Sequence, residues 1–196
     1  ATLYTMIGLL GVMGSGHLHA QRLNTLNPMK LASFEALWET EDPAPFAVYA
    51  DINKAAARND DEFLIPYMFS FMVHNSFHGE IKGINDLQRE AMEKYGNGNY
   101  IPDVKGMFWS FRAMIGVGGL MLAIVFLTAF LVYFKKIIDY KCWLKLLPFL
   151  IPLPFIANSV GWYIVEAGRQ PWIVVGLQRT AEAISPNLST GEVWLT

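Results

Sequence analysis

Two long uncharged runs constrain the fold of this chain more than any other feature. Residues 113–134 are 22 positions without a charge, and residues 146–165 are 20. An α-helix rises about 1.5 Å per residue, so either run is long enough to cross the roughly 30 Å hydrocarbon core of a bilayer. The second run contains Pro148, Pro152 and Pro154, which predict a bend and packing against other helices. We therefore predict spanning helices at 107–134 and 146–167.

The composition favours a membrane protein. Hydrophobic residues make up 53% of the chain and charged residues 16%, whereas a soluble domain carries about 25% charged residues. Cys142 is the only cysteine, so an internal disulfide is excluded. Residues 1–15 are also uncharged, and we expect them to be the end of a further spanning helix in an internal piece of a longer polypeptide. The expected fold class is all-α, a fragment of a multi-span transmembrane helical bundle.

Charge predicts which side each loop faces. The short segment 135–145 has four lysines and one aspartate, whereas the long segment 16–106 has eight Lys/Arg against thirteen Asp/Glu. The positive-inside rule places 135–145 in the cytoplasm. The long loop 16–106 is then extracytoplasmic, as is 168–196, which we expect to lead to a next helix. This orientation puts Arg112, Met114, Trp162 and Glu166 at the outer ends of the two spans.

The long loop has predicted structure of its own. Asn27 is a good helix cap with Pro28 at the first helical position. The run 28–39 places apolar residues near one face, with Lys30 and Glu35 beside them. Segment 65–77 is rich in Phe and Met and is expected to be semi-buried or interfacial. Segment 84–95 is amphipathic and predicts a helix that stops at the Gly/Asn run 96–99.

Glu166 closes the second apolar run and is followed by Arg169 and Trp172. A carboxylate at the mouth of a membrane helix is costly, so this position indicates either a ligand site or an exposed helix-terminal carboxylate. Trp162 lies one turn earlier on the same helix face, where interfacial tryptophans are also common. Arg169 either pairs with a charged group of a ligand or has a structural or phosphate-contacting role. Trp172 by itself indicates only an anchor at the membrane interface.

Met114 and Arg112 allow two interpretations. A thioether is a soft axial haem ligand, and an arginine nearby can pair with a propionate. The alternative is that Met114 only packs and Arg112 extends to the interface. Lys30 and Glu35 also allow two interpretations. They form either a solvated charge pair that contributes little stability or a proton-accepting site. The second is possible chemically because a carboxylate near a hydrogen-bonding lysine can accept a proton.

All four histidines fall in the long loop, at 17, 19, 74 and 78. The i, i+4 spacing of the second pair would align on a helix and could seat a metal. No cysteine or acidic residue stands at a matching spacing, so surface or hydrogen-bonded histidines are the better interpretation.

Three motifs bring in a family resemblance. They are Asn-Pro-Met-Lys-Leu-Ala-Ser-Phe-Glu-Ala-Leu-Trp-Glu-Thr at 27–40, Phe-Trp-Ser-Phe-Arg-Ala-Met at 108–114, and Gly-Trp-Tyr-Ile-Val-Glu-Ala-Gly-Arg-Gln-Pro-Trp at 161–172. The chain resembles subunit I of the cytochrome bd-type quinol oxidases in these motifs, in the order of the motifs and in the topology of its loops. It is most like the members that have a short quinol loop. The resemblance covers essentially the whole chain. It also implies that the histidine haem ligands lie on N-terminal helices outside this chain, so no histidine here has that role.

The resemblance implies an enzyme that oxidises membrane quinol and passes electrons through haems to reduce O2 to water. It builds a proton-motive force without pumping, and this fragment alone would be inactive. Lys30 and Glu35 would bind and oxidise quinol. Met114 would ligate a low-spin haem b, Glu166 a high-spin haem b or the haem d or b of the oxygen site, and Trp162 would lie between haems. Arg112 and Arg169 would pair with haem propionates.

The expected partners are the remainder of subunit I, a homologous subunit II, a possible small single-helix subunit, membrane lipid and quinol, with no nucleic acid. The expected location is the prokaryotic cytoplasmic membrane. Two alternatives stay open: a secondary transporter or channel fragment whose bent helix and mouth carboxylate bind an ion, and a haem-free quinone-binding structural subunit.

Overall fold

Two long apolar helices organise the structure, a computed structural model that describes residues 2–135 and 137–183. The first is α5 (Val104–Tyr133). The second combines α6 (Lys141–Leu146), the 3₁₀ turn η1 (Leu147–Leu150) and α7 (Pro152–Ala167). Both segments, Val104–Tyr133 and Lys141–Ala167, are long and apolar enough to cross a membrane. The predicted bend falls at the proline-containing 3₁₀ turn, because proline removes a backbone donor there.

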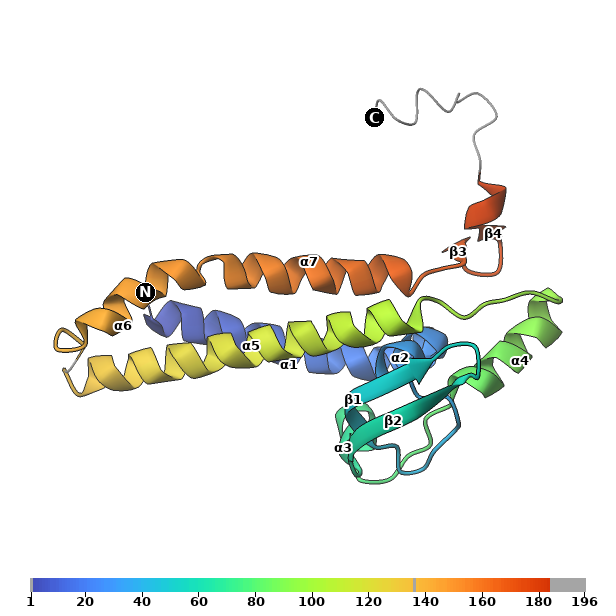
Figure 1. Ribbon diagram of the computed structural model, residues 1–196, viewed down its shortest axis with the longest axis horizontal. Helices are drawn as coiled ribbons and strands as arrows, with labels where there is room; N and C mark the ends of the chain where they lie inside the picture. The colour runs from blue at the N-terminus through green and yellow to red at the C-terminus, as the bar shows by residue number, and fades with distance from the viewer. Residues whose placement is uncertain (1, 136, 184–196) are drawn as a thin grey trace.

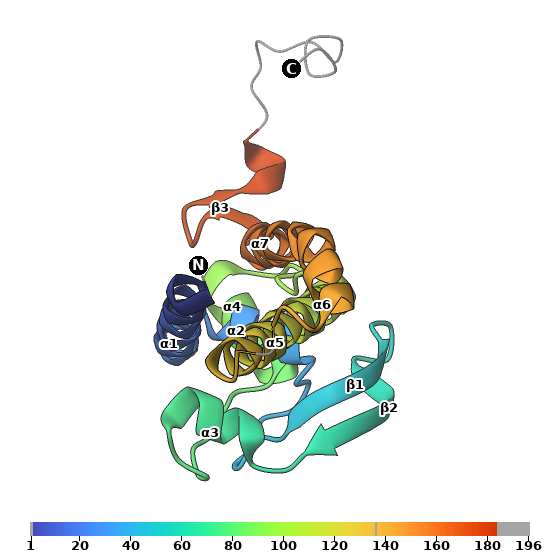
Figure 2. The same ribbon diagram turned by 90° about the vertical axis from the view of Figure 1, so that its left-hand side faces the viewer.

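Helix α1 (Thr2–Leu26) lies along α5, and α5 lies along α7 (Figures 1 and 2). Helix α1 continues without a break to Leu26, past residue 15, where the membrane-spanning part is predicted to end. The polar residues after position 15 are compatible with a helix, and the stop comes only where Pro28 follows. In the apolar stretch of α5, 11% of the residues are buried, and in that of the segment Lys141–Ala167 none are. The described part of the chain therefore leaves these apolar surfaces uncovered.

The remaining elements gather at one end of the long helices (Figure 1). We call five of them the outer module, after the extracytoplasmic side predicted for segment 16–106: α2 (Pro28–Glu35), β1 (Phe46–Asn53), β2 (Arg58–Ile65), α3 (Met68–His74) and α4 (Ile84–Tyr95). The predicted cap of α2 is confirmed, because the Asn27 side chain accepts a hydrogen bond from the Lys30 N–H at 3.1 Å. Helix α2 is shorter than the run 28–39, since Ala36 adopts a left-handed conformation with φ 53°. Helix α4 has the predicted bounds.

The all-α prediction was incomplete, because β1 and β2 pair as an antiparallel hairpin. In β1, Ala47, Ala50 and Ile52 are buried, but β2 is highly charged and lacks the alternation by which a half-buried strand is recognised. Its strand conformation comes from pairing with β1. A second, shorter hairpin joins β3 (Trp172–Val174) to β4 (Gln178–Arg179), followed by the turn η2 (Thr180–Glu182). Residues 184–196, the end of the loop predicted to lead to a next helix, lie outside the described residues.

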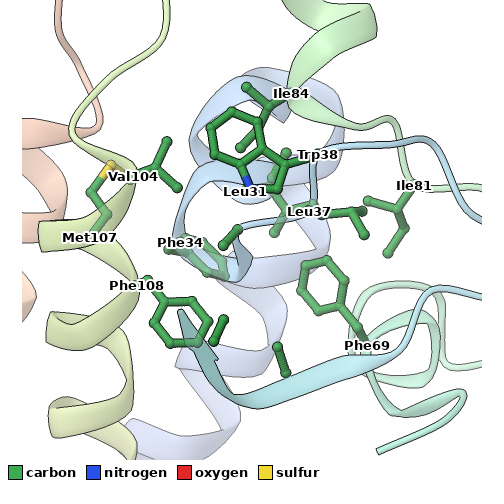
Figure 3. Packing of buried hydrophobic residues seen from close by; sticks show 14 of the residues in the cluster. Leu31, Phe34, Leu37, Trp38, Phe69, Ile81, Ile84, Val104, Met107 and Phe108 are labelled. Carbon is green, nitrogen blue, oxygen red and sulfur yellow. The ribbon is translucent and has the colours of Figure 1, made fainter. Parts of the chain in front are cut away.

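The hydrophobic core lies in the outer module, where α2 meets the first turns of α5 (Figure 3). Its largest fully buried side chains include Leu31, Phe69, Ile81, Ile84 and Phe108. The apolar residues that were expected near one face of the run 28–39 are all buried here: Leu31, Phe34, Leu37 and Trp38. This core fixes α2 against α5, and it thereby positions the polar residues described next.

Candidate functional site

The centre of the site is a buried ion pair between the outer module and α5. The Oε1 atom of Glu35 accepts hydrogen bonds from Arg112 Nη2 at 2.7 Å and from the Ala47 N–H at 2.6 Å. Arg112 also donates to the backbone carbonyls of Phe34 and Ala47. The side chains of Arg112 and Glu35 are 10% and 1% exposed. The guanidinium lies 3.7 Å from the centre of the Phe108 ring, a favourable cation–π geometry.

The second carboxylate oxygen of Glu35, Oε2, is buried and has no hydrogen-bond partner among the described residues. Burial raises the pKa of Glu35 to about 8, while Arg112 and the Ala47 N–H favour the charged form and hold it from rising further. A carboxyl group with a pKa close to ambient pH can both take up and release a proton. Glu35 therefore has the properties of a proton acceptor.

A pocket of about 210 Å³ adjoins Glu35 on the hairpin side. We call it the outer pocket. Its lining includes Glu35, Trp38, Glu41, Ala47, Asn59 and Glu62. Its volume is sufficient for several water molecules.

Lys30 lies on the other side of α2. It is 8% exposed, and its stem is so close to Gly168 that a Cβ atom there would lie 2.7 Å from Lys30 Cγ. Burial, and next the charge of Arg169, lower the pKa of Lys30. The solvated-pair alternative for Lys30 and Glu35 was wrong: both residues are buried, and Glu35 is paired with Arg112 instead. Helix α2 thus contacts the second motif through Glu35 and the third through Lys30.

Met114 lies two residues beyond Arg112 and faces a different neighbour. A Cβ atom on Gly161 of α7 would lie 3.3 Å from the Met114 sulfur, so the glycine leaves room for the thioether between α5 and α7. Two residues on a helix are about 200° apart, which explains why Arg112 reaches the outer module and Met114 reaches α7.

Glu166 and Arg169 pair with each other across one helical turn, at 2.5 Å. Their side chains are 41% and 43% exposed. Trp162, one turn before Glu166, is 68% exposed. Glu166 and Trp162 therefore lie on a surface of α7 that the described part of the chain does not cover. The propionate roles expected for Arg112 and Arg169 stay predictions; the structure gives them Glu35 and Glu166 as partners.

Trp172 packs within an aromatic cluster. Its ring stacks on Tyr100 with centroids 5.7 Å apart and meets Tyr95 edge-on at 4.9 Å. Arg179 lies over both Tyr100 and Trp172. The cluster joins the segment that follows α7 to the end of α4. The sequence indicated only an interfacial role for Trp172, since Tyr95 and Tyr100 are distant along the chain.

His17 and His74 each have a hydrogen-bond partner. His17 Nε2 lies 2.7 Å from Asn75 Oδ1, and His74 Nε2 lies 3.3 Å from the Glu80 carbonyl oxygen. In residues 2–135 and 137–183, no three His, Cys, Asp or Glu side chains are grouped as they would be around a metal ion.

The residues present fit the axial coordination of haem. A thioether is a known donor to haem iron and a carboxylate offers a hard oxygen donor; Met114 lies on α5 and Glu166 near the end of α7. Near Met114, a Cβ on Gly116, Gly118 or Gly119 would meet nothing within 4 Å. This bare stretch of α5 permits a flat macrocycle to approach the backbone.

Comparisons with known proteins agree on one family. The family model of cytochrome bd terminal oxidase subunit I matches residues 1–196. Cytochrome bd ubiquinol oxidase subunit 1 of Bacillus subtilis (strain 168) is 42% identical over 185 residues, which are 94% of this chain and 40% of the relative. Cytochrome bd-II ubiquinol oxidase subunit 1 of Escherichia coli (strain K12) is 26% identical, with 98% of this chain and 48% of the relative covered.

A solved structure supports the same assignment. The bd oxidase from Geobacillus thermodenitrificans superposes with a TM-score of 0.74 at 25% identity, covering 97% of this chain and 41% of that chain. The chain therefore spans less than half the length of these relatives. Because the family model covers every residue and both spanning helices and the outer module share the fold of a bd oxidase, the chain belongs to the cytochrome bd terminal oxidase subunit I family.

Proposed function

We propose that this chain forms the quinol-oxidising and haem-binding part of a respiratory terminal oxidase that reduces O2 to water. The observation that carries the proposal is the buried contact between Glu35 of α2 and Arg112 of α5. It joins a carboxyl group suited to proton transfer to the helix turn that bears Met114, a suitable haem ligand. Proton acceptance and electron acceptance are thus brought together, as quinol oxidation requires.

In this proposal the haems, when bound, supply one-electron acceptors and the site of O2 reduction. Glu35 accepts a quinol proton at its unpartnered oxygen, and Arg112 holds the carboxylate in place. Lys30 donates a hydrogen bond to the quinol head group from its buried position beside Gly168. Met114 would hold a low-spin haem b and Glu166 a high-spin haem, and Trp162 would pack among the haems.

The whole enzyme would contain the rest of subunit I, a homologous subunit II and possible small subunits, in the prokaryotic cytoplasmic membrane. The outer module would face the extracytoplasmic side, so quinol protons would be released outside while the protons consumed in making water come from inside. This would build a proton-motive force without a pump. A transporter or channel, and a haem-free structural subunit, are not favoured by the family to which the chain belongs.

The test uses purified full-length complex carrying Glu166→Gln. The substitution keeps the size and a carbonyl oxygen but removes the charge that stabilises ferric iron. We expect loss or perturbation of one high-spin haem by haem count and reduced-minus-oxidised spectra, together with suppressed O2 uptake. The Met114 haem signal should persist. Full high-spin haem content with normal O2 consumption would refute the role of Glu166, and absence of any haem bands in the wild-type complex would refute the oxidase itself.

A further inference from the structure

The outer pocket connects a buried acid to the protein surface. Glu35 lines its inner end and is 2% exposed, with one carboxylate oxygen unpartnered. Glu41 and Glu62 line the same pocket and are exposed. Glu39 is a third exposed lining carboxylate, so the pocket has one buried acidic group and three exposed ones, with room for water between them.

A hydrogen-bonded network through Asn59 orients the Glu62 carboxylate. Asn59 donates through Nδ2 to Glu62 Oε2 at 2.8 Å and to the Ala36 carbonyl at 3.1 Å. The Asn59 amide oxygen accepts from Trp38 Nε1 at 2.9 Å. Because Trp38 is buried and Ala36 directly follows Glu35 along the chain, the Glu62 carboxylate is tied to the backbone beside the buried acid.

The other charged groups around the pocket are committed elsewhere. Arg58 pairs with Asp60 at 3.0 Å, and Glu39 accepts from Asn85 at 2.8 Å. Arg112 lies against Glu35. Within the described residues, the three exposed lining carboxylates Glu39, Glu41 and Glu62 have no basic ion-pair partner, and the Asn59 network ties Glu62 to the backbone next to Glu35.

We propose that the outer pocket is the exit for protons taken from quinol, with Glu62 and Glu41 as the acceptors that pass them from Glu35 to the surrounding water. The inference rests on the proposed function, since it concerns the fate of the proton after quinol oxidation.

The proton and electron balance is simple. Quinol loses two protons and two electrons and becomes quinone, and the electrons leave to the haem of the proposed function. Each proton in turn binds the free oxygen of Glu35, moves through water in the pocket to a carboxylate at the mouth, and is released outside. Glu35 is then ionised again and ready for the next proton.

A raised pKa of the acceptor lessens the uphill step that a proton takes when it leaves Glu35. Burial raises the pKa of Glu35 to about 8, and burial together with the charge of Glu62 raises the pKa of Glu41 above its ordinary value. Glu41 is therefore a better proton acceptor than a free surface carboxylate, yet it lies close enough to solvent to release the proton.

The experiment uses the full-length complex with Glu62→Gln, Glu41→Gln and the double substitution. Glutamine at 62 retains the oxygen that accepts from Asn59, so the hairpin is preserved. Asp61→Asn is the matched control, because it removes the same charge from the neighbouring exposed position, which does not line the pocket. Quinol oxidation is measured as kcat and KM, in H2O and D2O, beside O2 uptake with ascorbate and a phenylenediamine, which supply electrons without quinol.

We expect the double variant to lose at least about tenfold in kcat with quinol, which is less than the roughly 100-fold effect typical of a direct acid or base. Its KM should stay near the wild-type value, its D2O effect should increase, and added imidazole should restore part of the rate. In the double variant, O2 uptake with the phenylenediamine should equal that of wild type. The Asp61→Asn variant should oxidise quinol at the wild-type rate.

The experiment distinguishes failure of the exit route from failure of the proposed function. If Glu35→Gln abolishes quinol oxidation while the double variant turns over like wild type, the exit route is wrong and the proposed function stands. If Glu35→Gln itself retains wild-type quinol turnover, the proposed function fails and the exit route fails with it. A double variant equally slow with both electron donors would also overturn the exit route, because the defect would not lie in proton release.

Discussion

The Glu35 carboxylate and the Arg112 guanidinium lie 2.7 Å apart, although 77 positions separate them in the sequence. Burial of both side chains makes the pair energetically demanding, since each charge loses most of its hydration. Backbone groups of Phe34 and Ala47 supply the additional hydrogen bonds that such a pair needs. Arg112 therefore connects α2, β1 and α5 in one place.

Quinol oxidation is expected to increase with pH because of Glu35. The pKa of this carboxyl group is raised from 4.5 to about 8, so the proton-accepting ionised form grows as pH rises toward about 8. In Glu35→Gln the rate should fall and this pH limb should disappear, with the haem spectrum nearly unchanged. The rate and its pH dependence are measured as steady-state turnover with quinol across about pH 6 to 9. An identical pH profile in the variant would contradict the assignment.

The same shift has a consequence for stability. A folded-state pKa above the unfolded value means that the folded protein binds the proton more tightly. The contribution of Glu35 is therefore fully present below about pH 4.5 and is lost as the pH rises through about 8.

Removing Arg112 should destabilise the outer module. At a pH above about 8, where Glu35 is ionised, Arg112→Gln leaves the Glu35 charge buried without its partner, and breaking a buried pair costs about 3–5 kcal/mol. The double variant Arg112→Gln/Glu35→Gln should recover part of that loss, because no unpaired charge remains. Thermal inactivation of the solubilised full-length complex measures both. Equal stability of wild type and Arg112→Gln would show that the pair contributes nothing.

Met114→Leu tests the low-spin haem ligand. The substitution conserves volume, so packing should lose at most about 1.5 kcal/mol, but the thioether is removed. The low-spin haem b should become five-coordinate or fall in midpoint potential. Met107→Leu is the matched control, since Met107 is fully buried in the core two turns earlier on the same helix. Unchanged low-spin spectra and potential in Met114→Leu would leave Met114 as a packing residue.

Gly168→Ala tests the contact between Lys30 and the third motif. The new Cβ would lie 2.7 Å from Lys30 Cγ and 2.8 Å from the Ile164 carbonyl oxygen, so α2 and the end of α7 must move apart. Overpacking of this kind costs about 1–3 kcal/mol, and quinol turnover should fall with Lys30 displaced. Gly16→Ala, where nothing lies within 4 Å, is the control. Wild-type stability and turnover in Gly168→Ala would show that the contact is not required.

The orientation of the chain is tested at Cys142, which is exposed. The lysine-rich segment 135–145 should be cytoplasmic, so an impermeant thiol reagent should not label Cys142 in intact cells. A cysteine placed at Lys54, in the hairpin turn of the outer module, should be labelled in a Cys142→Ser background. Labelling of Cys142 with no labelling at position 54 would reverse the topology.

Local patterns in the sequence were sufficient for the elements whose signals lie within one segment. Hydropathy, capping and periodicity predicted two helices long and apolar enough to cross a membrane, the cap at Asn27 and the bounds of α4, and the structure has all of them. The three motifs were sufficient for the family, since their order and residues resemble those of bd oxidases along the whole chain.

Only the tertiary structure decided which residues of the site contact one another. The strand β2 has no local signal, so the hairpin and the outer pocket depend on pairing with β1. Glu35 and Lys30 are five positions apart, yet one contacts Arg112 and the other packs beside Gly168. The reason is physical: spacing in sequence fixes which face of α2 a side chain occupies, but the partner on that face is selected by packing of the shared hydrophobic core between elements distant in the chain.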